Sequence, residues 1–327
     1  MRVISEILLS QVNRQREEIA RLGKEISTGL KVSRPGDSKQ SGTIAEFRDT
    51  LEKIKGFREQ ISNATSFLNY QESIVNEANQ IMIRAKEIAT QAANETNDSV
   101  VRSQMAQEVF ELRDHLVNLA NSKYLGRYVY GGANDDEPPY APNSTPYTNP
   151  ASGAASVRYT FNEDADPGAT VTRSVRVTDS ITITVNTPGN QVFDNAIQAL
   201  ERLGRAMAGY ETLPASGTPD GTGAAWTFPQ DYQTQTKAIQ NAIDLIDTAR
   251  EQDIMPEQVK LAGRMRRLET ASSILELSEE NTNEILDKMQ GTDVFDASSR
   301  LSYAQTSLQA SLTVLSRGLG NTILEYL

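Results

Sequence analysis

The sequence has no cysteine and a single histidine, His115, in 327 residues. The absence of cysteine excludes disulfide frameworks, thiolate metal sites and cysteine nucleophiles. One histidine also excludes metal sites that need two, including the zinc proteases with an H-E-x-x-H motif. We therefore expect neither a metal nor a cofactor.

Long apolar runs are absent as well. The first apolar stretch, residues 7–9, is too short for the core of a secretory signal peptide, and no run approaches the roughly 18 residues that span a bilayer. The 32 basic and 43 acidic residues give a net charge of −11, which opposes binding to nucleic acid. Composition alone favours a soluble cytosolic protein with no membrane and no nucleic-acid partner.

Proline is scarce outside the middle of the chain. Ten of the 12 prolines lie within residues 138–229, and half of the 20 glycines lie within residues 131–223. Because helix interiors exclude proline and disfavour glycine, the flanks are free to form long helices. We expect a mainly α protein with a small α+β insert, in which both chain ends form a long-helix coiled-coil bundle. The expected domains are terminal helices at 1–43 and 291–327, a helical bundle at 44–135 and 231–290, and an outward-facing insert at 136–230.

Apolar residues recur every seven positions before the middle region, with a second, mostly apolar set three residues after each. Such an a/d pattern, held over about seven heptads, is typical of a coiled coil. The first set consists of Phe47, Ile54, Ile61, Leu68, Val75, Met82 and Ala89. Asp98 or Ser99 is a suitable N-cap for the next helix. Further helices are expected over 193–207, 233–250 and 261–289, and short strands at 157–161, 175–177 and 181–185, with a turn at 187–190.

The two chain ends repeat the heptad spacing and form the candidate assembly interface. In each end, residues alternate at steps of four and three, with one glutamine in the seam. A polar seam residue lowers stability but can fix register and partner number. The candidate interface consists of Leu8, Val12, Gln15, Ile19, Leu22 and Ile26 near the start, and Leu301, Gln305, Leu308, Leu312, Leu315, Leu319, Ile323 and Leu327 near the end.

The last 27 residues hold only two charged side chains, Arg317 and Glu325. A helix on a protein surface normally carries many charges opposite its apolar stripe. Uncharged polar side chains are less costly to bury than charged ones. Since the first helix can cover only one side of the last one, we expect other subunits to cover the rest.

Other polar features have ordinary interpretations. We expect His115 on a helix surface with no catalytic partner, and residues 135–137 in a solvated acidic loop, because their spacing is not that of a calcium loop. Residues 221–223 lack the context of a dinucleotide site, and Trp226 is expected to anchor a small core. Arg264 and its basic neighbours are expected to pair with acidic side chains.

A motif after the first helix resembles the flagellin superfamily. Residues 26–38 read ISTGLKVSRPGDS, and members of this superfamily carry a similar serine/threonine-glycine turn that ends in proline and aspartate. Three other segments resemble the branch that joins the flagellar hook to the filament. They are the start (MRVIS), residues 126–132 (GRYVYGG), and the end, from DVFDA at residue 293 to the final ILEYL. The resemblance covers residues 1–135 and 255–327.

This resemblance implies a structural protein of the bacterial flagellum and not an enzyme. Such proteins are secreted through the flagellar type III channel without a cleaved signal peptide, so the implied location is extracellular. The implied partners are further copies in a ring, the other hook-associated junction protein, flagellin, and a dedicated export chaperone at the C-terminal region. The terminal helices would pack as coiled-coil tubes.

Three other functions compete with this interpretation. A flagellin, the bulk filament subunit, would share the architecture and differ in its C-terminal tail. An enzyme within residues 136–230 is disfavoured, because no paired carboxylates for acid–base catalysis stand at a recognisable strand end. A generic coiled-coil protein of type III secretion would lack the matched turn and C-terminal end.

Overall fold

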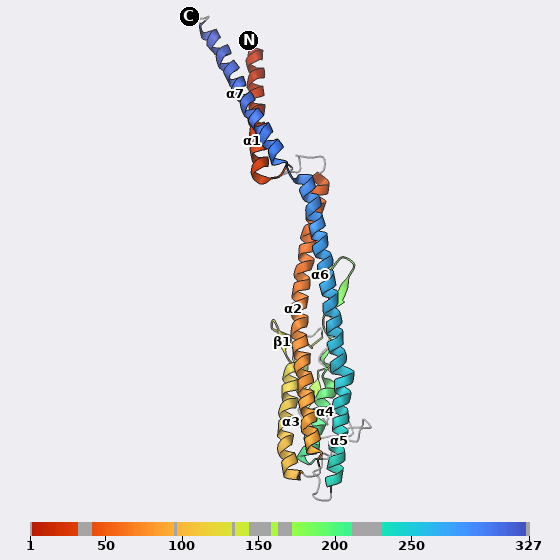
Figure 1. Ribbon diagram of the computed structural model, residues 1–327. Helices are drawn as coiled ribbons and strands as arrows, with labels where there is room; N and C mark the ends of the chain where they lie inside the picture. Colours follow the sequence, from red (N-terminus) through yellow and green to blue (C-terminus); the bar gives the residue numbers. More distant parts are fainter. Residues whose placement is uncertain are drawn as a thin grey trace. The chain divides into compact units, whose positions relative to one another are not determined.

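The structure, a computed structural model, describes residues 2–31, 41–94, 97–132, 135–143, 158–162, 172–210 and 231–324. It is mainly α-helical with small antiparallel sheets, which confirms the predicted fold class (Figure 1). The helices are α1 (Arg2–Thr28), α2 (Ser41–Ala92), α3 (Ser99–Ala120), α4 (Asp194–Ala208), α5 (Tyr232–Ala249), α6 (Met255–Gln290) and α7 (Val294–Leu324). The strands are β1 (Lys123–Tyr124), β2 (Arg127–Tyr128), β3 (Tyr140–Pro142), β4 (Tyr159–Phe161), β5 (Ser174–Arg176) and β6 (Thr182–Thr184).

The chain divides into two compact units. The first, which we call the terminal unit, consists of Met1–Gly56 and Ile274–Leu327. The second, the bundle unit, is Phe57–Ser273. The terminal unit contains α1, α7 and one end each of α2 and α6, where Ile44 and Leu286 are buried in a small apolar cluster.

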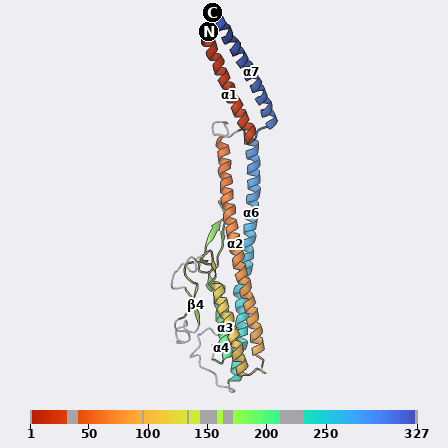
Figure 2. The same ribbon diagram turned by 90° about the vertical axis from the view of Figure 1, so that its left-hand side faces the viewer.

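The predicted heptad pattern of α2 is confirmed by burial. Phe47 is half-buried, and the other six residues of the first set are buried. Beyond residue 70, a third residue in each heptad is buried as well, namely Ile74, Ile81 and Ile88. The buried stripe widens because α2 has several neighbours within the bundle unit. Lys86 pairs with Asp247 of α5 at 2.7 Å, and α3 and α6 run along other sides (Figures 1 and 2).

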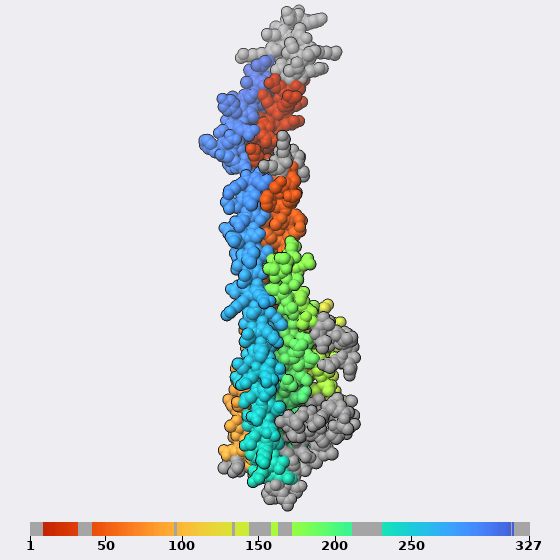
Figure 3. Space-filling model, turned by 90° about the vertical axis from the view of Figure 1, so that its right-hand side faces the viewer, coloured from red at the N-terminus to blue at the C-terminus, as the bar shows by residue number. Residues whose placement is uncertain are grey.

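Helices α3, α4 and α5 complete the bundle unit. The Asp98 side chain caps α3 by accepting a hydrogen bond from the Val101 backbone N–H, as predicted. The buried face of α4 consists chiefly of Phe193, Ile197, Leu200, Leu203 and Met207. Because α4 packs against both α3 and α5, this helix of the expected insert contributes to the bundle core. Figure 3 shows the green segment that includes α4 beside the cyan α5. The expected boundaries of the insert stay a prediction.

Two arginines lie on the buried face of α3. Arg113 pairs with Glu201 of α4 at 2.5 Å, and both side chains are almost fully buried. Arg102 donates a hydrogen bond to the Gln235 side-chain oxygen at 3.0 Å and lies over the Tyr232 ring. A buried charge without a partner is strongly destabilising, so these contacts fix how α4 and α5 face α3.

The backbone stays helical from α5 into α6 through a π-helical turn, Arg250–Ile254 (η4). Arg250 follows α5 and Met255 follows η4, and both residues have right-handed helical dihedral angles. In a regular α-helix, the ring of Pro256 would clash with the carbonyl group four residues before it. The wider π turn stands just before this proline, where the sequence pattern indicated two separate helices.

The expected strands are present. β4 and β6 fall within their predicted segments, and β5 begins one residue before its segment. The sheets pair β1 with β2, β3 with β4 and β5 with β6. The predicted turn at 187–190 overlaps a short 3-10 helix, Gly189–Gln191 (η3). The Tyr140 hydroxyl donates to the Gly189 carbonyl oxygen at 3.1 Å, which ties this turn to β3.

Gly204 of α4 provides a test of the α3–α4 contact. A Cβ atom placed there would lie 2.5 Å from the Phe110 ring of α3, whereas a Cβ at Gly263 of α6 would meet nothing within 4 Å. We expect Gly204→Ala to destabilise the protein by about 1–3 kcal/mol through overpacking. The control, Gly263→Ala, is expected to stabilise it by about 0.5–1 kcal/mol, because alanine favours a helix interior. Urea unfolding of the full chain measures both, and equal shifts would contradict the close contact.

Candidate assembly interface

Helices α1 and α7 lie side by side and run in opposite directions (Figures 1 and 2). Gln15 of α1 donates a hydrogen bond from Nε2 to Ser307 Oγ of α7 at 2.7 Å. Further along α1, Glu18 pairs with Arg300 at 3.3 Å. Higher residue numbers on α1 thus pair with lower residue numbers on α7, as expected for antiparallel helices. The seam glutamine of α1 thus makes a polar contact across the pair, and its role in fixing the register stays a prediction.

A hydrogen-bonded crossing closes one end of this pair. Leu30 and Gly291 form an isolated antiparallel β-bridge, and the Lys31 N–H donates to the Gln290 carbonyl oxygen at 2.7 Å. Thr292 Oγ1 donates to a carboxylate oxygen of Glu25 at 2.6 Å. Glu25 is buried and also accepts from Arg21, so its charge is compensated.

Short and apolar side chains make up the contact between the helices. On α1, Val12 and Leu22 are buried. On α7, the less exposed side chains recur at steps of four and three, namely Ala297, Leu301, Ala304, Leu308 and Ser311. This period is that of a coiled-coil seam, so this face of α7 lies against α1. Three of its five residues are alanine or serine, which lets the two helices approach closely.

Part of the predicted seam lies in this contact. The half-buried members are Gln15, Ile19, Ile26, Leu301 and Leu308. Gln305 and Leu312 are exposed, because Ala304 and Ser311 take the alternate positions against α1. The side chains of Leu8, Leu315, Leu319 and Ile323, and the whole of Leu327, lie outside the described residues. A role of these residues between subunits stays a prediction.

The side of α7 away from α1 carries large exposed side chains. Phe295 is 84% exposed and Tyr303 is 82% exposed, and Val314 is more than half exposed. We call these three residues the outer face of α7. No charged residue stands between Arg300 and Arg317, so most of this helix is uncharged as well as exposed. Exposed aromatic groups on an uncharged helix are typical of a surface that another protein covers.

The sequence pattern missed the outer face of α7. Phe295, Tyr303 and Val314 do not share a heptad position, so no seam contains them. The low charge of the last 27 residues already led us to expect that other subunits cover the rest of this helix, and Tyr303 lies in that segment. Phe295 lies before that segment, between Asp293 and Asp296, so neither the heptad spacing nor the low charge indicated it.

The acidic loop at 135–137 corrects one expectation. We expected a solvated loop, but Asp135 is buried and receives two guanidinium groups, from Arg127 at 3.2 Å and Arg173 at 2.6 Å. The spacing of the acidic residues does not reveal this, because Arg173 lies 38 positions further along the chain. Asp136 and Glu137 are exposed as expected.

The remaining polar features agree with their ordinary interpretations where they are described. His115 is exposed on α3, and its Nε2 lies 3.0 Å from a carboxylate oxygen of Glu77. Arg264 pairs with Glu257 at 3.3 Å, as predicted. The segment 221–223 and Trp226 lie outside the described residues.

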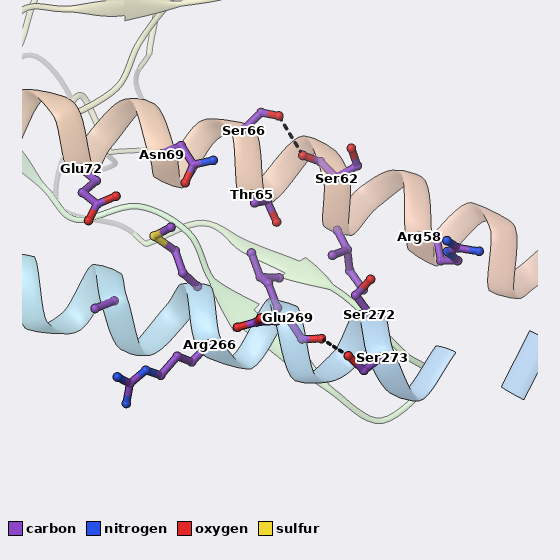
Figure 4. Close-up of a pocket in the computed structure, with 14 residues that line it drawn as sticks. Arg58, Ser62, Thr65, Ser66, Asn69, Glu72, Arg266, Glu269, Ser272 and Ser273 are labelled. Carbon is purple, nitrogen blue, oxygen red and sulfur yellow. Dashed lines mark hydrogen bonds between the residues drawn. The ribbon is translucent and has the colours of Figure 1, made fainter. Parts of the chain in front are cut away.

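An open groove of about 790 Å³ runs between α2 and α6 within the bundle unit. Figure 4 shows that hydroxyl groups from both helices line it, with charged side chains such as Arg58 and Glu269 among them. In the described part of the chain, no three His, Asp or Glu side chains gather as metal ligands would. No described helix is long and apolar enough to cross a bilayer.

Two family models match the chain. The model of the bacterial flagellin N-terminal helical region matches residues 2–135, and that of the C-terminal helical region matches residues 233–327. Together they include α1, α2, α3, α5, α6 and α7, which is well over half of the chain. The chain belongs to the flagellin family.

Within this family, the chain is similar to flagellar hook-associated protein 3. The protein of that name from Escherichia coli is 23% identical over 285 residues, which are 84% of this chain and 83% of the relative. The one from Salmonella typhimurium is 26% identical over 149 residues, 43% of this chain and 46% of the relative. A flagellin from Clostridium tyrobutyricum is 29% identical over 117 residues, 35% of this chain and 30% of the relative. The last two matches thus span less than half of those relatives.

Solved structures share the fold. A flagellar hook-associated protein from Vibrio parahaemolyticus superposes with a TM-score of 0.59 at 17% identity, over 78% of this chain and all of that one. FlgL from Xanthomonas campestris gives a TM-score of 0.57 at 15% identity, over 74% of this chain and 99% of that one. At these identities the likeness concerns the arrangement of the helices.

The contacts of Glu18, first with Arg21 on its own helix and second with Arg300 of α7, predict a small acid sensitivity of the α1–α7 pair. A hydrogen bond from Arg21, and to a smaller degree the charge of Arg300, hold the pKa of Glu18 below its ordinary value of 4.5. Because the pKa is lowered in the folded state, the stabilisation is complete above pH 4.5 and is lost as the pH falls through the lowered pKa.

We therefore expect Glu18→Gln to lower the thermal stability of the α1–α7 pair at pH 7 but not at pH 2. The effect is small, because the contact is exposed to solvent. Circular dichroism melts of both proteins at the two pH values measure it. Glu17→Gln, which changes an exposed neighbour on the same helix, is the control. An equal loss in both variants would contradict the role of the Arg21 and Arg300 contacts.

Proposed function

We propose that this chain is a structural subunit of the bacterial flagellum that forms the junction between hook and filament. The observation that carries the proposal is the environment of α7. One side of this helix packs on α1, while the other presents Phe295 and Tyr303 to solvent on a helix with almost no charge. An exposed apolar surface of this kind is typical of a protein–protein interface, and neighbouring subunits in an assembly would bury it.

The proposed mechanism is packing of paired terminal helices between neighbouring subunits. Leu312, at 40% exposed, and the outer face of α7 are the part of the interface that lies free in one copy. Burying a leucine, phenylalanine or tyrosine side chain gains about 1.5–3 kcal/mol each, so a few such residues from each of many copies can hold an assembly together.

The proposed partners are all parts of the flagellum or of its assembly. They are further copies of this chain in a ring, the other hook-associated junction protein on one side and flagellin on the other. A dedicated chaperone would hold the C-terminal region before export, and export would leave no cleaved signal peptide. The mature subunit would be extracellular, with no catalytic residue and no cofactor.

A bulk flagellin is the second candidate. The fold of the terminal helices suits both functions, because both need paired helical ends. The alignment with hook-associated protein 3 extends over 84% of this chain, whereas that with a flagellin extends over 35%. This difference favours the junction subunit.

Immunogold electron microscopy distinguishes the two candidates. An antibody to residues 136–230, applied to intact flagella, is expected to label a single band where the hook meets the filament. Label along the whole filament would make the chain a flagellin. Flagella without any label would overturn both candidates.

Leu312→Asp tests the proposed interface. Because Leu312 is exposed in one copy, aspartate there should leave the monomer folded and exported. A carboxylate buried between subunits without a partner costs several kcal/mol, so the variant should fail to assemble and the cells should lack attached filaments. Leu312→Met, which stays apolar, is the control and should assemble. Normal filaments on cells with the aspartate variant would show that Leu312 lies outside the interface.

A further inference from the structure

The turn between β1 and β2 displays a leucine in an unfavourable backbone conformation. Leu125 and Gly126 form the two-residue turn, with φ angles of +51° and +85°. Turns of this kind strongly favour asparagine, aspartate or glycine at the first position, because other side chains are strained there. Leu125 is 88% exposed, so no packing within the chain offsets the strain. Strain kept at an exposed position suggests a function outside the single copy.

The hairpin that carries Leu125 is anchored and basic. We call residues 123–128 the hairpin tip. The Tyr124 ring packs against Phe67 and Tyr70 of α2, with ring centroids 5.5 and 5.6 Å apart. Lys123 lies over the Tyr128 ring at 4.3 Å. The aromatic contacts hold the hairpin tip in place, so Leu125 is presented at a fixed position among cationic groups.

The exposed side of α6 in the terminal unit has complementary chemistry. Ile274 and Leu277 are more than half exposed, and Ile285 follows on the same face of the helix. An acidic row, Glu276, Glu280 and Glu284, runs beside them at steps of four residues. We call these six residues the acidic strip. Glu284 pairs with Lys288 at 2.6 Å, while Glu276 and Glu280 have no ion pair with any described residue.

We propose that the hairpin tip of one copy docks on the acidic strip of a second copy. Leu125 would pack between Ile274 and Leu277, and Lys123 would approach Glu280. This inference rests on the proposed self-assembly and names the surfaces that carry it. The two surfaces differ, so the contact is head-to-tail, and repetition of such a contact closes a ring or extends a helical array. A second copy is the occupant because the chain itself supplies both the basic apolar tip and the acidic apolar strip.

The absence of cysteine makes a direct test possible. Leu125→Cys and Leu277→Cys variants are expressed together, and isolated flagella are treated with a short reagent that joins two thiols. A linked dimer is expected only when both variants are present. Each copy then holds one thiol, so a link between the two positions must join two copies. The control pairs Leu125→Cys with Val259→Cys, which is exposed on α6 outside the strip and should give no dimer.

The outcomes separate this inference from the proposed function. Gold label at the junction without a Leu125–Leu277 link would overturn the docking and leave the junction role intact. Equal links to positions 277 and 259 would also overturn it, because they would indicate random collision. Flagella without label would overturn the proposed function and the docking together.

Leu125→Asn gives a second readout, with opposite signs for folding and assembly. Asparagine tolerates the left-handed conformation, so the Tm of the monomer should rise by about 2–4 °C. The same change removes the apolar contact, so the linked dimer and the attached filaments should be lost. A variant with a lower Tm would contradict the strain at Leu125, and normal assembly would overturn the docking.

Discussion

The structure depends on one geometric constraint: a helix with an apolar stripe must cover that stripe with a neighbour. Along α2 the stripe widens where more helices lie against it, and a further position in each heptad is buried at Ile74, Ile81 and Ile88. In the terminal unit, α1 and α7 pack chiefly against each other. Two helices can bury one face each, and the rest of α7 stays exposed, with Phe295 and Tyr303 as its largest side chains.

Polar groups set the register that apolar packing leaves open. Gln15 bonds to Ser307, and Glu25 to Thr292, across the α1–α7 pair. In the bundle unit, Arg113 and Glu201 do the same for α3 and α4. Coiled-coil seams can slide by a heptad at modest cost, whereas a buried ion pair or amide has one partner. Such contacts therefore select one arrangement among several that bury similar apolar area.

Much of the fold could be predicted from the sequence, because α2 and α4 bury their apolar residues at regular spacing. The heptad spacing indicated that Val109 and Leu116 of α3 are buried, but it did not reveal Arg102 and Arg113 on the same face. An arginine is expected on the surface unless its partner is known, and Glu201 lies 88 positions away from Arg113. The same reason explains Asp135. In the candidate interface, the heptad spacing placed Leu312 in the seam, but Ser311 is the half-buried residue and Leu312 is exposed.

The pairing of α1 with α7 also has a consequence for folding kinetics. Gln15 and Ser307, which bond to each other, are 292 positions apart. Contacts so distant in sequence form slowly, because a long stretch of chain loses entropy before any contact is made. Whichever end of the chain becomes available first, this pair must wait for the other end. The surface proposed for assembly is therefore expected to be among the last parts of the subunit to form.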